Sequence, residues 1–182
     1  MSPQVLTPSQ KQALLDLARQ AVNARVAGAT APDVRATDLP AAFGVFVTIK
    51  RGDELRGCLG TLDSHGPLAD DVVRCAADAA TRDPRFERVS ASELPELSLE
   101  VSVLGPLEPV DPTDAAAVAI GRHGLVVEHG HRRGLLLPQV ASERGWTVDE
   151  FLQQTCVKAG LAPDAWRRGA RIWRFDAEVF GE

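Results

Sequence analysis

Apolar residues recur at helical spacing in three stretches of the chain. The first and third stretches begin with capping boxes, in which Thr7 pairs with Gln10 and Thr147 pairs with Glu150. The second stretch ends before Pro84, because a residue that precedes a proline is disfavoured in helical geometry. The spacing predicts helices over residues 7–28, 67–83 and 147–160, and a short helix is also expected over 113–119.

Strict alternation of apolar and polar residues marks the strands. It is clearest over 97–103, and it predicts a hairpin in which 45–50 returns as 55–60. A second hairpin is expected to join 125–128 to 134–137, with a last strand over 171–175. Helices and hairpins are interleaved instead of alternating as βαβ units. The order therefore favours an α+β fold, a mostly antiparallel sheet with flanking helices, over a doubly wound fold.

The length and composition fit one ordinary domain over residues 1–182, with a candidate subdomain boundary in the loop near 105–112. The chain has 182 residues, of which 45% are hydrophobic and 25% charged, so it can bury a core without a disulfide or a structural metal. The formal net charge is −5, which makes nucleic acid an unlikely partner.

The cysteines and the apolar runs indicate a reducing compartment. Cys58, Cys75 and Cys156 form no C-x-x-C pair, and Cys75 and Cys156 fall on apolar helical stripes, where a core position is expected. The first residues resemble no secretory signal, and no apolar stretch reaches the roughly 20 residues that span a bilayer. We therefore expect a cytoplasmic protein with no membrane segment.

Cys58 is the sharpest chemical feature of the sequence. It lies between Gly57 and Gly60, and glycines let a ligand or another backbone come close. Arg56 would share a face with Cys58 in a regular strand, where a cation favours the thiolate. This pattern makes Cys58 a candidate nucleophile, with Arg56, Gly57 and Gly60 as candidate ligand contacts. A packed, inert thiol is the alternative, because free cysteine is among the most buried residue types.

Four more residues are candidates for the same site. Asp83 and Arg85 flank a proline. In the functional interpretation Arg85 binds a carboxylate or phosphate, and in the structural one Asp83 only hydrogen-bonds nearby backbone. Glu100 is the one charge among the polar positions of strand 97–103, so it is either a general base or half of an ion pair with an arginine such as Arg56 or Arg85. His123 lies between two glycines, as a general base or as a hydrogen-bonded lock on its loop.

The common cofactor and hydrolase motifs are missing from the sequence. There is no P-loop, H-E-x-x-H, G-x-S-x-G or Rossmann glycine run. His129 and His131 lack a third ligand, which leaves a weak metal signal. We predict no cofactor and no metal site from the residues.

The segment Leu55–Gly60, read L-R-G-C-L-G, resembles the L-R-G-C-[IL]-G hexapeptide of the AMME chromosomal region protein family, where isoleucine is usual in place of Leu59. Further family blocks follow in order at 83–86, 93–94, 99–104, 123–125, 137–140 and 158–161, with Trp166 after them. They cover nearly the whole chain. The sequence is similar to the bacterial and archaeal type, called AmmeMemoRadiSam system protein A.

The resemblance implies an α+β fold of two intimately joined subdomains. It also implies association with a Memo-type protein and a radical S-adenosylmethionine enzyme, in the modification of a nucleotide or another biomolecule. It supplies no mechanism. Two functions stay open at this point: an enzyme or enzyme subunit with Cys58 at its site, acting on a small anionic ligand, and a non-catalytic scaffold for those partners.

Overall fold

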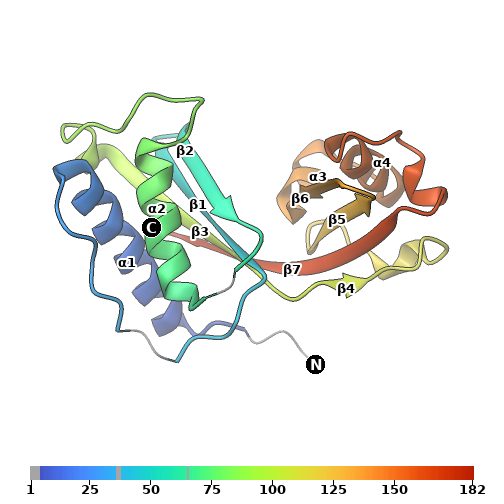
Figure 1. Ribbon diagram of the computed structural model, residues 1–182, viewed down its shortest axis with the longest axis horizontal. Coiled ribbons are helices and arrows are strands. Elements are labelled where there is room, and N and C mark those ends of the chain that lie inside the picture. The colour runs from blue at the N-terminus through green and yellow to red at the C-terminus, as the bar shows by residue number, and fades with distance from the viewer. Residues whose placement is uncertain (1–4, 36–37, 65) are drawn as a thin grey trace. The chain divides into compact units, whose positions relative to one another are not determined.

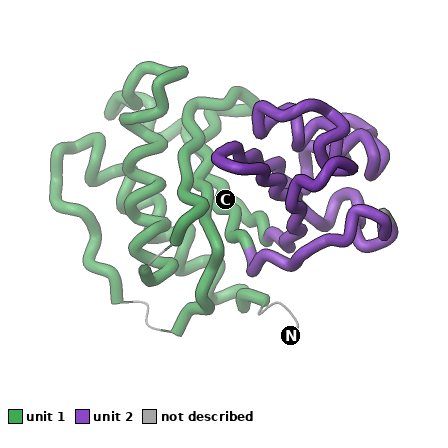
Figure 2. The backbone as a smooth tube through the Cα atoms, turned by 45° about the vertical axis from the view of Figure 1, so that its right-hand side comes forward, with its two compact units in different colours: residues 1–104, 178–182 green, residues 105–177 purple. Residues whose placement is uncertain are grey.

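The computed structural model describes residues 5–35, 38–64 and 66–182 and has an α+β fold with antiparallel strands. The chain forms two compact units, which Figure 2 colours separately. Unit 1 contains residues 1–104 and 178–182, and unit 2 contains residues 105–177. Unit 2 is therefore inserted into the sequence of unit 1 just before its last five residues.

The sheet of unit 1 is built from three antiparallel strands in the order β2-β1-β3, so β2 is an edge strand. The strands are β1 (Gly44–Arg51), β2 (Glu54–Thr61) and β3 (Leu97–Leu104). The last strand of the chain, β7 (Arg171–Gly181), ends in this unit, where the amide of Glu182 donates to the carbonyl of Leu99 at 3.1 Å. This confirms the predicted strands over 45–50, 55–60 and 97–103.

Two helices, α1 (Pro8–Ala27) and α2 (Leu68–Thr81), cover one face of this sheet (Figure 1). Val45, Val47 and Ile49 of β1 point into the core beneath the helices and are fully buried. Successive strand residues point to opposite faces, so Thr48 and Lys50 lie on the other side of the sheet. The predicted alternation thus separates an apolar face under the helices from a polar face that carries Thr48 and Lys50.

Unit 2 places two helices on a smaller antiparallel sheet. Its elements are β4 (Glu108–Pro109), β5 (His123–His129), β6 (Arg132–Leu136), α3 (Pro138–Arg144), α4 (Val148–Lys158) and residues 171–177 of β7. Strand β5 lies between β6 and β7, and β4 pairs with β7. The core packs Leu125 and Val127 of β5 against Phe151 and Leu152 of α4. The capping boxes at Thr7 and Thr147 both form as predicted.

Three elements differ from the sequence-based expectation. The helix expected over 113–119 is only a 3-10 turn, Ala115–Ala117, because its alanines and single valine give little apolar side-chain surface to pack against a core. Helix α3 was not predicted: its seven residues carry start and stop signals in Pro138 and Gly145 but too short a pattern. Strand β7 continues beyond residue 175 to Gly181. Residues 176–181 show no strict alternation of apolar and polar side chains, so the sequence did not predict this extension.

None of the helices in the described part of the chain is both long and apolar enough to cross a membrane.

Replacement of Gly57 by alanine tests the contact between β2 and α2. A Cβ at Gly57 would overlap the carbonyl oxygen of Ala79, which is backbone and cannot move aside cheaply. We expect Gly57→Ala to lower the free energy of unfolding by about 2–3 kcal/mol, the usual range for overpacking. Gly66→Ala is the matched control, because a Cβ there meets no atom within 4 Å. Urea unfolding of both variants is the measurement, and equal stabilities would show that β2 does not press on α2.

Candidate functional site

Three polar residues form a row across the strands of unit 1. Thr48 at the middle of β1 lies opposite Cys58 of β2 on one side and opposite Glu100 of β3 on the other. The row lies on the polar face, away from α1 and α2. Neighbouring strands are about 4.8 Å apart, so Cys58 and Glu100 stand roughly 10 Å from each other with Thr48 between them.

Cys58 is the only half-exposed cysteine, whereas Cys75 and Cys156 are buried. The hydroxyl of Thr48 donates a hydrogen bond to the Cys58 sulfur, with an Oγ1–Sγ distance of 3.3 Å. The expectation that Cys75 and Cys156 lie in the core is confirmed.

The backbone of Cys58 is held by the loop that follows α2. Asp83 accepts a hydrogen bond from the Cys58 amide at 2.9 Å, and Arg85 donates to the Cys58 carbonyl at 3.4 Å. Because β2 is an edge strand, the amide and carbonyl of Cys58 on its outer side have no neighbouring strand to pair with. We call Asp83 and Arg85 the edge clamp, because together they take the place of a neighbouring strand at Cys58.

The edge clamp is a tightly bonded ion pair. Arg85 donates to Asp83 through Nε at 3.0 Å and through Nη2 at 2.7 Å, and the Asp83 side chain is only 2% exposed. The hydrogen bond from Arg85 holds the pKa of Asp83 far below its usual range, with the Cys58 and Arg85 amides adding to it. The pKa of Arg85 is raised, first by the hydrogen bond to Asp83 and further by electrostatic interactions with Asp83 and Cys58. The Arg85 guanidinium, 56% exposed, therefore lies within electrostatic range of the sulfur.

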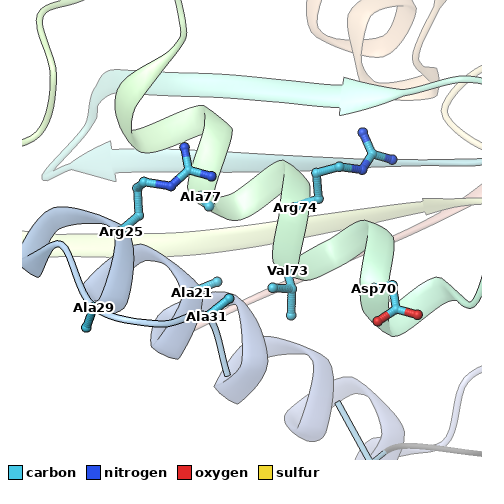
Figure 3. A pocket seen from close by; sticks show the side chains of 8 residues that line it. All are labelled: Ala21, Arg25, Ala29, Ala31, Asp70, Val73, Arg74 and Ala77. Atoms are coloured by element: carbon cyan, nitrogen blue, oxygen red, sulfur yellow. The ribbon is translucent and has the colours of Figure 1, made fainter. Parts of the chain in front are cut away.

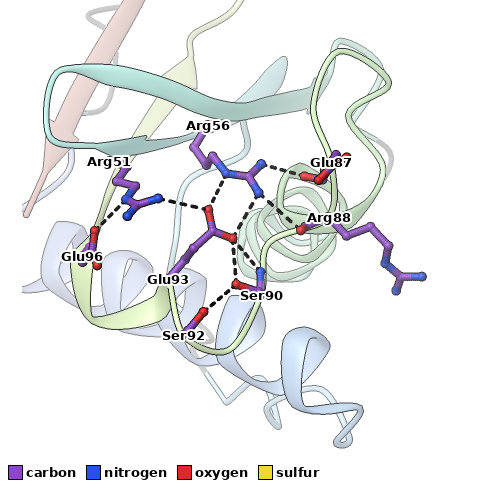
Figure 4. A network of polar contacts seen from close by, with 8 residues as sticks. All are labelled: Arg51, Arg56, Glu87, Arg88, Ser90, Ser92, Glu93 and Glu96. Atoms are coloured by element: carbon purple, nitrogen blue, oxygen red, sulfur yellow. Dashed lines mark hydrogen bonds and ion pairs between the residues drawn. The ribbon is translucent and has the colours of Figure 1, made fainter.

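Arg56 is used in a separate network at the start of β2 (Figure 4). It donates to both carboxylate oxygens of Glu93, at 2.7 and 3.1 Å, and to the carbonyls of Glu87 and Arg88. The hydrogen bond from Arg56 lowers the pKa of Glu93 to about 2, with the Ser90 amide as the next cause. The pairing of β1 and β2 is irregular next to Arg56, so the shared face expected of a regular strand does not apply. Its predicted role in ligand binding stays a prediction.

Gly57 and Gly60 serve packing in this structure. Gly57 lies against Ala79 of α2, and a Cβ at Gly60 would overlap the ring of Phe46 across the hairpin. Both glycines do let another group come close, as expected, and in each case that group belongs to the protein itself. Contact with a ligand at either glycine stays a prediction.

Glu100 has a lysine as its partner. Lys50 of β1 lies 3.5 Å from the Glu100 carboxylate, where the sequence had suggested an arginine. Both side chains are partly exposed, at 41% for Lys50 and 31% for Glu100. The pair adds a cation and a carboxylate to the polar face that carries Cys58 and Thr48.

His123 belongs to unit 2, whereas the other candidate residues belong to unit 1. Its Nδ1 accepts a hydrogen bond from the Ala119 amide at 2.9 Å, and its Nε2 lies 3.9 Å from Asp176. Burial lowers the pKa of His123, so the ring is neutral at pH 7 with its proton on Nε2. The contacts are those of a loop-locking histidine, and a role as general base stays a prediction.

A hollow of about 280 Å³ lies between α1 and α2, away from the polar face (Figure 3). Alanines line much of it, and its two arginines are already engaged: Arg25 with Asp78 and Thr81, and Arg74 with Asp71. Within the described residues, no group of three or more histidine, cysteine, aspartate or glutamate side chains is arranged to hold a metal ion.

The chemistry of the polar face is that of a thiol with donors and a carboxylate nearby. Cys58 can attack an electrophilic carbon or hold a ligand, Lys50 and the exposed side of Arg85 can attract an anion, and Glu100 can accept a proton. Sequence reasoning missed Thr48 and Lys50. Their signal was present, because the alternation in 45–50 places both on the face opposite the core.

Alkylation tests the separation of the three thiols. We expect iodoacetamide at pH 8 to add one label to the native chain, at Cys58. Burial raises the pKa of Cys75 to about 11, which leaves about one thiol in a thousand ionised at that pH, and burial also raises the pKa of Cys156. Peptide mapping by mass spectrometry identifies the site, and Cys58→Ser is the unlabelled control. Native labelling at Cys75 with none at Cys58 would contradict this assignment.

The stability contributed by Glu93 depends on pH. Its folded-state pKa is lowered, so the contribution is complete above the unfolded value of about 4.3 and is lost as pH falls toward 2. We expect Glu93→Gln to lower the free energy of unfolding by about 2–3 kcal/mol at pH 7 and by much less at pH 2. Urea unfolding across this range measures the difference. Exposed Glu143→Gln is the control, and an equal loss at both pH values would refute the ion-pair explanation.

The chain is similar to several archaeal proteins over almost its entire length. It is 43% identical over 189 residues to a protein of Methanothermobacter thermautotrophicus, covering 97% of this chain and 96% of that one. It is 40% identical to a protein of Methanosarcina acetivorans, with coverages of 98% and 94%. The crystal structure of the uncharacterized protein PH0010 from Pyrococcus horikoshii matches with a TM-score of 0.84 at 38% identity, covering 97% of this chain and 93% of the other. The AMMECR1 family model matches residues 15–180, and the chain belongs to this family.

Proposed function

We propose that this chain is an enzyme or enzyme subunit in which the Cys58 thiol reacts with, or holds, a small anionic substrate. One observation carries the proposal: Cys58 is half-exposed, its sulfur accepts a hydrogen bond from Thr48, and its backbone is fixed on the outer side by Asp83. A thiol that only fills the core requires no donor on its sulfur. A reacting thiol benefits from one, and from a backbone that cannot move.

The charges around Cys58 support an anionic substrate. The Arg85 guanidinium is 56% exposed and keeps free donors beyond its bonds to Asp83, while Lys50 adds a second cation on the polar face. Glu100, roughly 10 Å from the sulfur, would serve as a base only for a substrate that extends along the row past Thr48. A role of His123, which belongs to unit 2, in proton transfer stays a prediction.

The resemblance to AmmeMemoRadiSam system protein A supports a proposal about the partners with which the chain would act. The chain would act together with a Memo-type protein and a radical S-adenosylmethionine enzyme in the modification of a biomolecule. A cysteine that captures or positions a substrate fits a component that needs further enzymes to complete a modification.

A reconstituted system of the three proteins tests the proposal. We expect the wild-type chain to increase consumption of S-adenosylmethionine, and Cys58→Ala to reduce it to the level without this chain, a loss of about 100-fold or more if the thiol is the nucleophile. Thr48→Val should give a smaller loss, because it removes only the donor to sulfur. Wild-type protein alkylated at Cys58 should behave like Cys58→Ala. Full activity of a folded Cys58→Ala variant would remove the thiol from the mechanism.

A non-catalytic binding module is the second candidate. It is favoured by the internal use of the signature residues: Arg56 is held by Glu93, Gly57 packs on α2, and Asp83 bonds the backbone of Cys58. Under this alternative, co-purification with the two partners would be unchanged by Cys58→Ser and the reconstituted activity would also be unchanged. Loss of activity with retained co-purification supports the enzyme.

A further inference from the structure

A groove in unit 2 combines an apolar floor with a basic rim. It has a volume of about 270 Å³ and lies where β6, α3 and α4 meet. Its lining residues are Leu136, Val140, Arg144, Trp146, Gln154, Val157 and Lys158. All of the groove's residues belong to unit 2, whereas Cys58 and its neighbours belong to unit 1.

The apolar part of the groove is open to solvent. Val157 of α4 is 48% exposed, although valine on a helix of this size normally faces the core. Trp146 is half-buried, and its ring lies 6.5 Å from the buried ring of Phe151, which fixes its position. A rigid tryptophan beside an exposed aliphatic side chain is typical of a surface that receives a partner.

The two cations at the rim are not neutralised. Arg144 lies over the Trp146 ring at 5.6 Å, and neither it nor Lys158 forms an ion pair with a carboxylate of the described residues. Other arginines of the same unit do form such pairs: Arg122, Arg167, Arg168, Arg171 and Arg174. Arg144 and Lys158 also stand in the last turns of α3 and α4, where the helix dipole favours positive charge without a ligand.

We propose that this groove binds an acidic segment of a partner protein, with one bulky apolar side chain in the groove and aspartates or glutamates on either side of it. The open apolar floor supplies the site for the anchor, and the unpaired Arg144 and Lys158 supply the charge complement for the flanking carboxylates. The volume of about 270 Å³ is below the roughly 300–1,000 Å³ of pockets that enclose whole small molecules, and it suits a single side chain. Gln154 adds a donor and an acceptor for the backbone of the bound segment.

A designed peptide tests the groove in the full chain. The probe is a blocked nonapeptide with leucine at its centre, two glutamates on each side of it and serine elsewhere. We expect a saturable shift of the Trp146 indole N–H resonance in ¹H–¹⁵N spectra, with the resonances of Trp166 and Trp173 unchanged. Arg144→Glu, Lys158→Glu and Val157→Glu should each weaken binding about fivefold or more. The matched control is Arg88→Glu, an exposed arginine of unit 1, which should change the affinity less than about twofold.

Several results would overturn the proposal. The absence of a saturable shift at millimolar peptide would do so, as would equal binding of a peptide with lysines in place of the glutamates. Tighter binding of decanoate than of the peptide would assign the groove to a small amphiphile instead. Binding to phosphatidylserine vesicles without binding to the peptide would assign it to a membrane surface. None of these measurements involves Cys58, so the result is independent of the proposed thiol chemistry.

Discussion

The buried carboxylate of Asp83 fixes the edge strand β2 at Cys58. The edge strand β2 leaves the amide of Cys58 without a strand partner, and the carboxylate accepts its hydrogen bond. A buried carboxylate in turn requires a cation, and Arg85, two residues further along, provides it through two hydrogen bonds. The Nη2 of Arg85 also donates a hydrogen bond to the carbonyl of Cys58. The position of the thiol therefore depends on a loop that precedes β3 in the sequence and is not part of the sheet.

The residues around this clamp divide the hairpin into a side that packs on the rest of unit 1 and a polar side that carries Cys58. Gly57 brings β2 against α2, and Arg56 ties the start of the strand to Glu93. These contacts leave Cys58 on the polar face with Thr48, Lys50 and Glu100. A rigid scaffold beneath a partly exposed thiol is the arrangement expected of a site that must present one sulfur in one orientation.

Much of the fold follows from local patterns, whereas the site does not. The capping boxes at Thr7 and Thr147 and the alternation in 97–103 are local, and the structure confirms the elements they predict. The pairing of Thr48 with both Cys58 and Glu100 depends on strand order, which no single segment encodes. The partner of Arg56 was missed for a similar reason, because the irregularity between β1 and β2 turns its side chain toward a loop 37 residues away. Sequence reasoning thus grouped Cys58 with Arg56 and Arg85 but could not say that Arg85, and not Arg56, contacts the Cys58 backbone.

The insertion of unit 2 has a consequence for synthesis on the ribosome. Unit 1 needs residues 178–182, because Glu178 bonds the Leu6 amide and Lys11, and Glu182 pairs with Arg19 and with the Leu99 amide. Residues 1–104 emerge first, yet these bonds wait until all of unit 2 has been translated, a delay of roughly 4 to 15 s at 5–20 residues per second. During that interval the nascent sheet exposes the β3 edge that the last residues later occupy. This unpaired edge is therefore where chaperones would bind the growing chain and where aggregation would begin.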